Sequence, residues 1–227
     1  MADLIVTIDG PAGSGKSTVA RLLAQELQAS FLDTGAMYRA VTLAAMQAGA
    51  DLRDEQKLLG IVHGRRFQFS SRAGGMSVAI DGADVTEQIR SPDVTASARY
   101  IASSAKVREE LVRMQREFAS RRRKIVTEGR DQGTVAFPDA NVKFFLTADP
   151  AERARRRQAE LQAKGCHESL EQTRKAIDER DDSDRSRAVG PLKPAQDAIV
   201  VDTTELTIEQ VVEKLLELVK ERCLENG

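Results

Sequence analysis

A glycine-rich segment near the start of the chain has the residue types and the spacing of a phosphate-binding loop. Residues 10–17 read GPAGSGKS and fit G-x-x-x-x-G-K-[ST] at every fixed position. The glycines let the backbone curl so that its N–H groups face a phosphate chain. We expect Lys16 to reach the β- and γ-phosphates of a nucleoside triphosphate, and the Ser17 hydroxyl to hold Mg²⁺ directly. The residues expected to bind this nucleotide are Gly10, Pro11, Ala12, Gly13, Ser14, Gly15, Lys16, Ser17 and Thr18.

The segments on either side of this loop are those that a phosphate loop requires. Residues 4–8 (LIVTI) form a β-branched apolar run that predicts a buried parallel strand. Residues 18–27 carry apolar side chains at helical spacing, and the helix N-terminus adds its positive dipole end. A glycine-rich turn without a ligand could also join a strand to a helix. The complete pattern with both flanks favours nucleotide binding.

Two further groups of polar residues follow expected strands. Residues 33–39 (DTGAMYR) come after a short strand at 29–33, and Arg39 lies one turn into the next helix. Its guanidinium can bind a phosphate, or it can remain in solvent beside a capped helix end. The sequence leaves these two interpretations open.

The second group is EGRDQG at residues 128–133, directly after a strand at 124–128. Many phosphate-loop enzymes place the carboxylate that organises Mg²⁺ and its waters after such a strand, so we expect Glu128 to act through water. The two glycines permit a sharp turn, which lets both Arg130 and Asp131 point into a cleft. A surface turn explains the glycines but not the adjacent opposite charges.

Residues 151–187 are dense in charge and predict two helices with a break near Lys164 and Gly165. Such a segment is either a mobile charged lid or a solvated helical hairpin. Arginines close to a phosphate loop favour a lid that clamps the transition state.

Within this segment, helical spacing predicts which charges face the same way. Arg180, Asp184 and Arg187 fall at i, i+4 and i+7, on one face of a helix. Asp181 and Arg185 are expected to pair on the neighbouring face.

Alternating strand and helix signals predict the architecture, an α/β fold with a doubly wound five-stranded parallel sheet and ligands at the carboxyl ends of its strands. Expected strands span residues 4–8, 29–33, 124–128, 142–146 and 198–202, with helices at 34–48 and 207–222. Period-two runs at 66–70, 76–80 and 83–85, with a turn at 73–75, predict a small antiparallel insertion. This insertion is either a surface flap or part of the substrate site. We expect one domain, 1–227, with the insertion at 62–92 and the lid at 151–187.

Composition narrows the class of protein. With 34 basic and 35 acidic residues among 227, the near-neutral charge argues against a general nucleic-acid binder. Cys166 and Cys223 are far apart, which suits a reduced cytosolic protein. No signal peptide or membrane-length apolar run is evident. We therefore expect a cytoplasmic monomer without nucleic-acid or membrane partners.

Taken together, these segments resemble the bacterial cytidylate kinases, nucleoside monophosphate kinases that make CDP and dCDP from CMP and dCMP. The matching stretches lie at 7–18, 32–39, 129–135 and 179–187, and the likeness extends over essentially the whole chain. The first stretch alone indicates a superfamily, whereas the other three together are specific. The resemblance implies ATP and Mg²⁺ as cofactors, CMP and dCMP as substrates, a lid, and an enlarged monophosphate-binding insertion.

The resemblance also implies roles for individual side chains. These roles are cytosine contact for Thr34, Arg108 and Asp131, phosphate contact for Arg39, Arg130 and Arg187, and sugar contact for Arg180 and Asp184. Lys16, Arg130 and Arg187 would be the catalytic residues.

Three positions depart from the usual pattern of this family. Thr34 stands where serine is common and keeps the hydroxyl, and Glu128 stands where aspartate is common, which changes the spacing of the Mg²⁺ water network. Arg99 stands near the position where a sugar-contacting serine is common in the family, which leaves the choice between ribose and deoxyribose open.

The chemistry of cytosine fits the implied base contacts. Cytosine offers an amino donor at N4 and acceptors at N3 and O2, which match a carboxylate at Asp131 and a cation at Arg108. Uracil would place a carbonyl against the carboxylate, at a cost of about 1–3 kcal/mol.

Rival functions remain to be compared with this one. The nearest is another kinase of the same fold, such as an adenylate, uridylate or shikimate kinase, and the insertion and residues 129–133 count against it. A regulatory GTP switch would need Asn-Lys-x-Asp and Asp-x-x-Gly, and the sequence has neither. A purely structural ATP-binding protein leaves the many arginines unexplained.

Overall fold

A five-stranded parallel sheet forms the centre of the molecule, as expected. The computed structural model describes residues 2–72, 74–163 and 165–225. The strands, in the spatial order β2-β6-β1-β7-β8, are β2 (Ser30–Asp33), β6 (Lys124–Gly129), β1 (Leu4–Asp9), β7 (Val142–Thr147) and β8 (Ile199–Asp202). Each predicted strand is found within one residue at either end. Because β1 lies between β6 and β7, the chain leaves β1 at the point where the strand order reverses, which is where open α/β sheets bind ligands.

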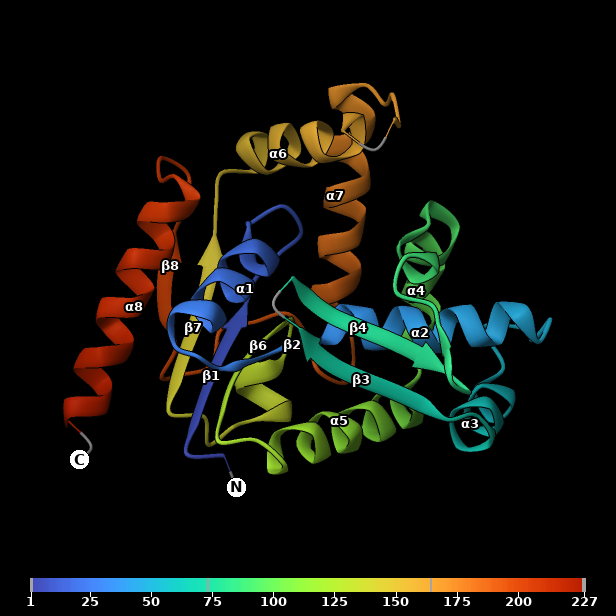
Figure 1. Cartoon of the computed structure of the whole chain (residues 1–227). Helices are drawn as coiled ribbons and strands as arrows, with labels where there is room; N and C mark the ends of the chain where they lie inside the picture. Colours follow the sequence, from blue (N-terminus) through green and yellow to red (C-terminus); the bar gives the residue numbers. More distant parts are fainter. Residues whose placement is uncertain (1, 73, 164, 226–227) are drawn as a thin grey trace.

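Helices cover both faces of this sheet (Figure 1). On one face lie α1 (Lys16–Glu26) and α8 (Ile208–Glu225), whose side chains Leu23 and Leu215 pack onto Ile8 in one fully buried cluster. On the other face lie α2 (Thr34–Gln47) and α5 (Ala105–Ser120), with Met37 and Leu111 in a second cluster. The two apolar cores fix the sheet, so that the carboxyl ends of its strands form a rigid platform.

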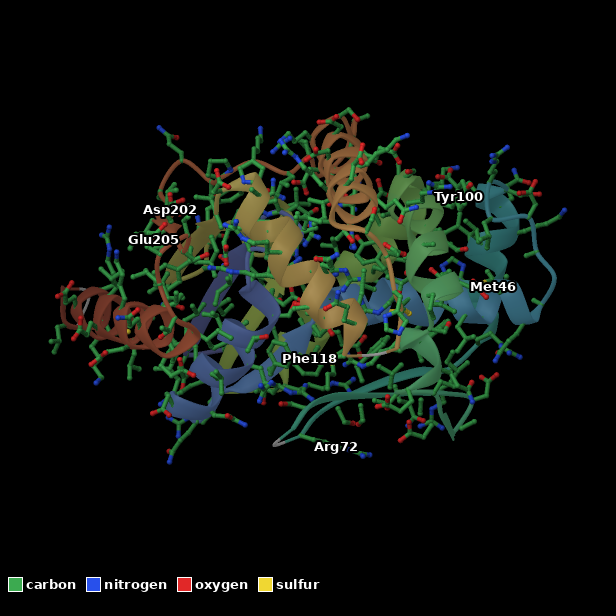
Figure 2. The ribbon with its side chains drawn as sticks, turned by 90° about the horizontal axis from the view of Figure 1, so that it is seen from above. Met46, Arg72, Tyr100, Phe118, Asp202 and Glu205 are labelled. Carbon is green, nitrogen blue, oxygen red and sulfur yellow. The ribbon has the colours of Figure 1, made fainter. Side chains whose placement is uncertain are left out.

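A second, antiparallel sheet stands where the insertion was expected, in the order β3-β4-β5. Its strands are β3 (Phe67–Arg72), β4 (Gly75–Ile80) and β5 (Ala83–Asp84). Ala73 in the expected turn lies outside the described residues. The backbone N–H of Phe31 in β2 donates to Ser71 Oγ at 2.9 Å, which ties β3 to the edge of the main sheet. Figure 2 shows Arg72, the last residue of β3, at the outer edge of the molecule.

Three helical elements that the sequence analysis did not predict complete this side of the molecule. They are α3 (Glu55–Gly64), the short 3₁₀-helix η1 (Gln88–Arg90) and α4 (Pro92–Ser103). Leu58 and Ile89 from these elements join the core beneath α2. Asp54 and Ser91 cap α3 and α4 by accepting hydrogen bonds from backbone N–H groups of the first turn.

The charged segment forms two helices above the carboxyl ends of the strands (Figure 1). They are α6 (Pro150–Gln162) and α7 (Leu170–Arg185). Gly165 lies between them as expected, while Lys164 lies outside the described residues. The predicted helical stripe is wrong at one position, because α7 ends at Arg185 and Arg187 follows the helix. None of the described helices is long and apolar enough to cross a membrane.

Candidate active site

The phosphate loop connects β1 to α1 at the reversal of strand order. Gly15 has φ of 82°, a left-handed conformation that favours glycine, and it begins α1. Lys16 is only 6% exposed, and its Nζ donates to the carbonyl of Pro11 at 3.1 Å. Burial, followed by the charge of Arg130, lowers the pKa of Lys16 to about 7. A bound polyphosphate would therefore restore the full charge of this ammonium group.

Two side-chain oxygen atoms suited to binding a metal ion lie together beside the loop. The exposed Ser17 Oγ donates to Glu128 Oε1 at 3.0 Å, which joins the start of α1 to the end of β6. Burial and the neighbouring carboxylate of Asp33 raise the pKa of Glu128. The described residues contain no cluster of three or more metal-binding side chains. The Ser17 hydroxyl and the Glu128 carboxylate are oxygen donors and fit Mg²⁺, which keeps several waters and takes the rest of its ligands from substrate phosphates.

The residues expected to read the base come together as a buried ion pair. Arg108 of α5 donates to Asp131, and its guanidinium lies over the ring of Tyr38 at 5.5 Å from the centroid. Thr34 lies close by, with its Oγ1 donating to the carbonyl of Glu128 at 2.7 Å. Gly190 packs directly against the pair, since a Cβ at this position would overlap both side chains. Donor and acceptor groups are thus paired in the interior, between α5, α2 and the loop after β6.

A second group of charged side chains lies where the lid meets the loop after β6. Asp184 is buried and accepts from Arg130 Nε at 2.7 Å with one oxygen and from Arg187 with the other. Burial alone would raise the pKa of Asp184, but Arg130 and Arg187 hold it below its usual value. These two ion pairs join the loop after β6 to the C-terminal end of the lid, a contact that the sequence analysis did not predict.

Three other arginines named in the sequence analysis lie outside these two groups of paired charges. Arg39 pairs with Asp33 at 3.2 Å, and the same carboxylate caps α2. Arg180 is exposed and, among the described residues, makes no hydrogen bond or ion pair. Arg99 is exposed and stacks on Tyr100 at 5.0 Å from the ring centroid.

The predicted pairing of Asp181 with Arg185 is wrong. Asp181 instead pairs with Arg153 of α6, while Arg185 pairs with Asp182 at the surface. The spacing rule for helices considers one helix alone, whereas a buried carboxylate takes the partner that removes it from solvent with good geometry.

Arg153 and Asp181 bind the phosphate loop itself, a role that the sequence analysis missed. Arg153 Nη1 donates to the carbonyl of Ala12 at 3.0 Å, and the N–H of Ala12 donates to Asp181 Oδ1 at 3.2 Å. Beside them, Ala154 and Ile177 pack against Ala12. The basic run from Arg153 onward was a visible signal, but nothing in the spacing indicated which of its members is buried.

The carboxyl edge of the five-stranded parallel sheet thus carries a glycine-rich phosphate loop, an oxygen pair suited to Mg²⁺, and the side chains of Arg130 and Arg187. A family model, described as cytidylate kinase, matches residues 6–221. The chain therefore belongs to the cytidylate kinase family.

Individual relatives agree with this placement. The chain is 48% identical to a cytidylate kinase from Shouchella clausii, over 95% of this chain and 96% of the relative. It is 47% identical to a cytidylate kinase from Rhodopirellula baltica, over 96% and 93% of the two chains. Its fold is similar to that of TT1252 from Thermus thermophilus, with a TM-score of 0.50 and 19% identity over 96% of this chain and 98% of the other.

Proposed function

We propose that this chain transfers the γ-phosphoryl group of ATP to CMP or dCMP and releases ADP with CDP or dCDP. The observation that carries the proposal is the buried ion pair between Arg108 and Asp131, beside Thr34 and on the same edge of the sheet as Lys16. A phosphate loop alone fits many kinases. A buried cation and carboxylate facing one another offer the donor and the acceptor that cytosine needs.

The donor nucleotide is held by the phosphate loop. Backbone N–H groups of residues 13–15 and the N-terminus of α1 face the phosphates, and Lys16 carries a positive charge to the β- and γ-phosphates. Ser17 would bind Mg²⁺ directly and Glu128 through water. When bound, Mg²⁺ neutralises charge that develops between the β- and γ-phosphates.

The acceptor phosphate is held by arginines. Arg130 and Arg187 face it from the loop after β6 and from the end of the lid, and Arg39 faces it from α2. Asp184 and Arg180 bind the sugar. The acceptor oxygen is already anionic, so no side chain acts as nucleophile, and catalysis consists of positioning and charge neutralisation.

Base choice follows from the Arg108–Asp131 pair. Asp131 accepts from the N4 amino group, while Arg108 donates to N3 and O2. Uracil presents a carbonyl to Asp131, which costs about 1–3 kcal/mol, equivalent to roughly 5–150-fold in relative rate.

The test is ADP release measured with each monophosphate in turn. CMP and dCMP should both be phosphorylated well, UMP less so, and AMP and GMP hardly at all. Preference for UMP or AMP would overturn the base assignment, and ATP hydrolysis independent of every monophosphate would overturn the kinase assignment. We also propose that the enzyme acts in the cytoplasm and is a monomer. Size-exclusion chromatography tests the oligomeric state by comparison with the chain mass of 24.9 kDa.

A further inference from the structure

Asp9 is a buried carboxylate that the transfer reaction does not use. It is the last residue of β1 and directly precedes the phosphate loop, and it is 4% exposed. Oδ1 accepts from the backbone N–H of Gln132 at 2.9 Å, and Oδ2 accepts from the N–H of Gly133 at 2.8 Å. A carboxylate at the end of β1 thus holds the backbone of a different segment, 123 residues further along the chain.

The segment that Asp9 holds is a single turn of π-helix at Gln132–Ala136. The π-helix is rare and occurs mostly as single turns, often at functional sites. This turn begins immediately after Asp131, the carboxylate proposed to read cytosine. The first N–H groups of a helical turn have no partner within it, and Asp9 provides one for two of them.

The far end of the same turn is held by α5. Arg116 donates from Nε to the carbonyl of Ala136 at 2.8 Å and from Nη2 to the carbonyl of Val135 at 2.9 Å. The same helix carries Arg108, the partner of Asp131. Two independent contacts therefore fix the turn, one from β1 and one from α5, and the carboxylate of Asp131 is presented from its entrance.

We propose that Asp9 is a positioning residue for the acceptor base: through the amides of Gln132 and Gly133 it sets the orientation of Asp131 and so the preference for cytosine over uracil. This inference rests on the proposed function. Asp9 also connects the donor and acceptor sites, because it is the residue before Gly10 of the phosphate loop and accepts hydrogen bonds from the turn that follows Asp131.

The chemistry of the contact makes Asp9→Asn an informative change. Asparagine has nearly the same shape but keeps only one acceptor oxygen, so its amide NH₂ would face a backbone N–H and push the turn away. Burial raises the pKa of Asp9 to about 7, and the two backbone N–H groups oppose that shift. The wild-type carboxylate is thus held by these amides rather than by an ion pair with a neighbouring side chain, among the residues that the structure describes.

Thr7→Val provides the matched control on the same strand. Thr7 shares a face of β1 with Asp9, lies beside Gly133, and is buried with its hydroxyl lacking a hydrogen-bond partner within the described chain. Valine therefore preserves the shape without removing a hydrogen bond. Arg116→Ala tests the other end of the turn from an exposed position, and it remains informative if Asp9→Asn fails to fold.

The experiment compares steady-state kinetics with CMP and UMP, and calorimetric binding of CMP and of an ATP analogue, in all four proteins. For Asp9→Asn we expect kcat/KM for CMP to fall about 10–100-fold and that for UMP less than about 3-fold, with ATP-analogue affinity changed less than about 3-fold. Arg116→Ala should lower the CMP-to-UMP ratio in the same direction, and Thr7→Val should leave it unchanged.

Distinct outcomes overturn distinct claims. Equal losses for CMP and UMP in Asp9→Asn and Arg116→Ala would show that the turn supports the fold rather than base choice. A loss of ATP-analogue affinity as large as the loss for CMP would assign Asp9 to the phosphate loop. Failure of the wild-type protein to phosphorylate CMP would instead refute the proposed function.

Discussion

Replacing Asp181 with asparagine should destabilise the protein strongly, because this carboxylate joins the lid to the phosphate loop. Asp181 is 1% exposed on α7 and pairs with Arg153, which is 4% exposed on α6. Both side chains also bind the backbone of Ala12. Asp181→Asn removes the charge while keeping the size of the side chain, so that its effect reports on the ion pair rather than on a cavity.

The magnitude follows from what remains after the change. Removing one partner of a buried ion pair costs about 3–5 kcal/mol, because the other charge is left uncompensated. Arg153 would still donate to the carbonyls of Ala12 and Ala148, and asparagine keeps one acceptor oxygen, which favours the lower end, about 3 kcal/mol. In a chain of this length each kcal/mol lowers Tm by about 2–4 °C, so the expected decrease is about 6–12 °C.

Asp182→Asn is the matched control, since Asp182 is the next residue and carries the same charge. Its side chain is 80% exposed and its contact with Arg185 is 3.5 Å long. Surface changes of this kind stay within about 0.5 kcal/mol, or about 2 °C in Tm. Thermal unfolding followed by circular dichroism compares the two variants with the wild type. Equal Tm values for the two variants would refute the buried pair and its contact with the phosphate loop.

Two further substitutions and two binding measurements have definite expected outcomes. Lys16→Ala should lower kcat by at least about 100-fold while thermal unfolding stays close to wild type; near-normal turnover would contradict the mechanism. Asp131→Ala should lower kcat/KM for CMP much more than for UMP, and equal losses would assign Asp131 to architecture. Hydrogen exchange over residues 151–187 should slow more with an ATP analogue plus CMP than with either alone; full protection by the analogue alone would contradict coupled closure. At pH 8 Lys16, whose pKa burial lowers to about 7, is mostly neutral, and phosphates that restore its charge should cause uptake of about one proton. Calorimetry in buffers of different ionisation enthalpy measures this uptake, and an equal uptake by Lys16→Met would assign the proton elsewhere.

The strands could be predicted closely because each is an apolar run that ends at a polar motif. Val142 to Leu146, for example, is a buried strand with no competing helical period, and the structure extends it by a single residue. The helix α5 was missed although it carries a clear signal. Val107, Leu111 and Phe118 recur at helical spacing and are buried.

Contacts between distant segments could not be predicted from spacing. The expected pairing of Asp181 used the i, i+4 rule, which holds for a helix in solvent. Its actual partner, Arg153, lies on another helix, 28 residues away, and no local pattern distinguishes it from the neighbouring arginines of the same run. Likewise, nothing in the sequence distinguishes Asp9 from any other polar residue at the end of a strand. Only the fold places its carboxylate against the backbone of Gln132.

The charges of the proposed acceptor site are paired with one another, and this has a consequence for binding. Asp184 holds both Arg130 and Arg187, so an acceptor phosphate that binds these arginines competes with a buried carboxylate. Displacing this carboxylate costs part of the binding energy of the phosphate. Before the substrate arrives, however, the same ion pairs keep the guanidinium groups aligned, which lowers the reorganisation needed during transfer. Because Asp184 belongs to α7, a phosphate that draws the arginines away also frees a carboxylate of the lid to accept from a sugar hydroxyl. Acceptor binding and lid position would then be one equilibrium rather than two, as linkage through a shared ion network requires.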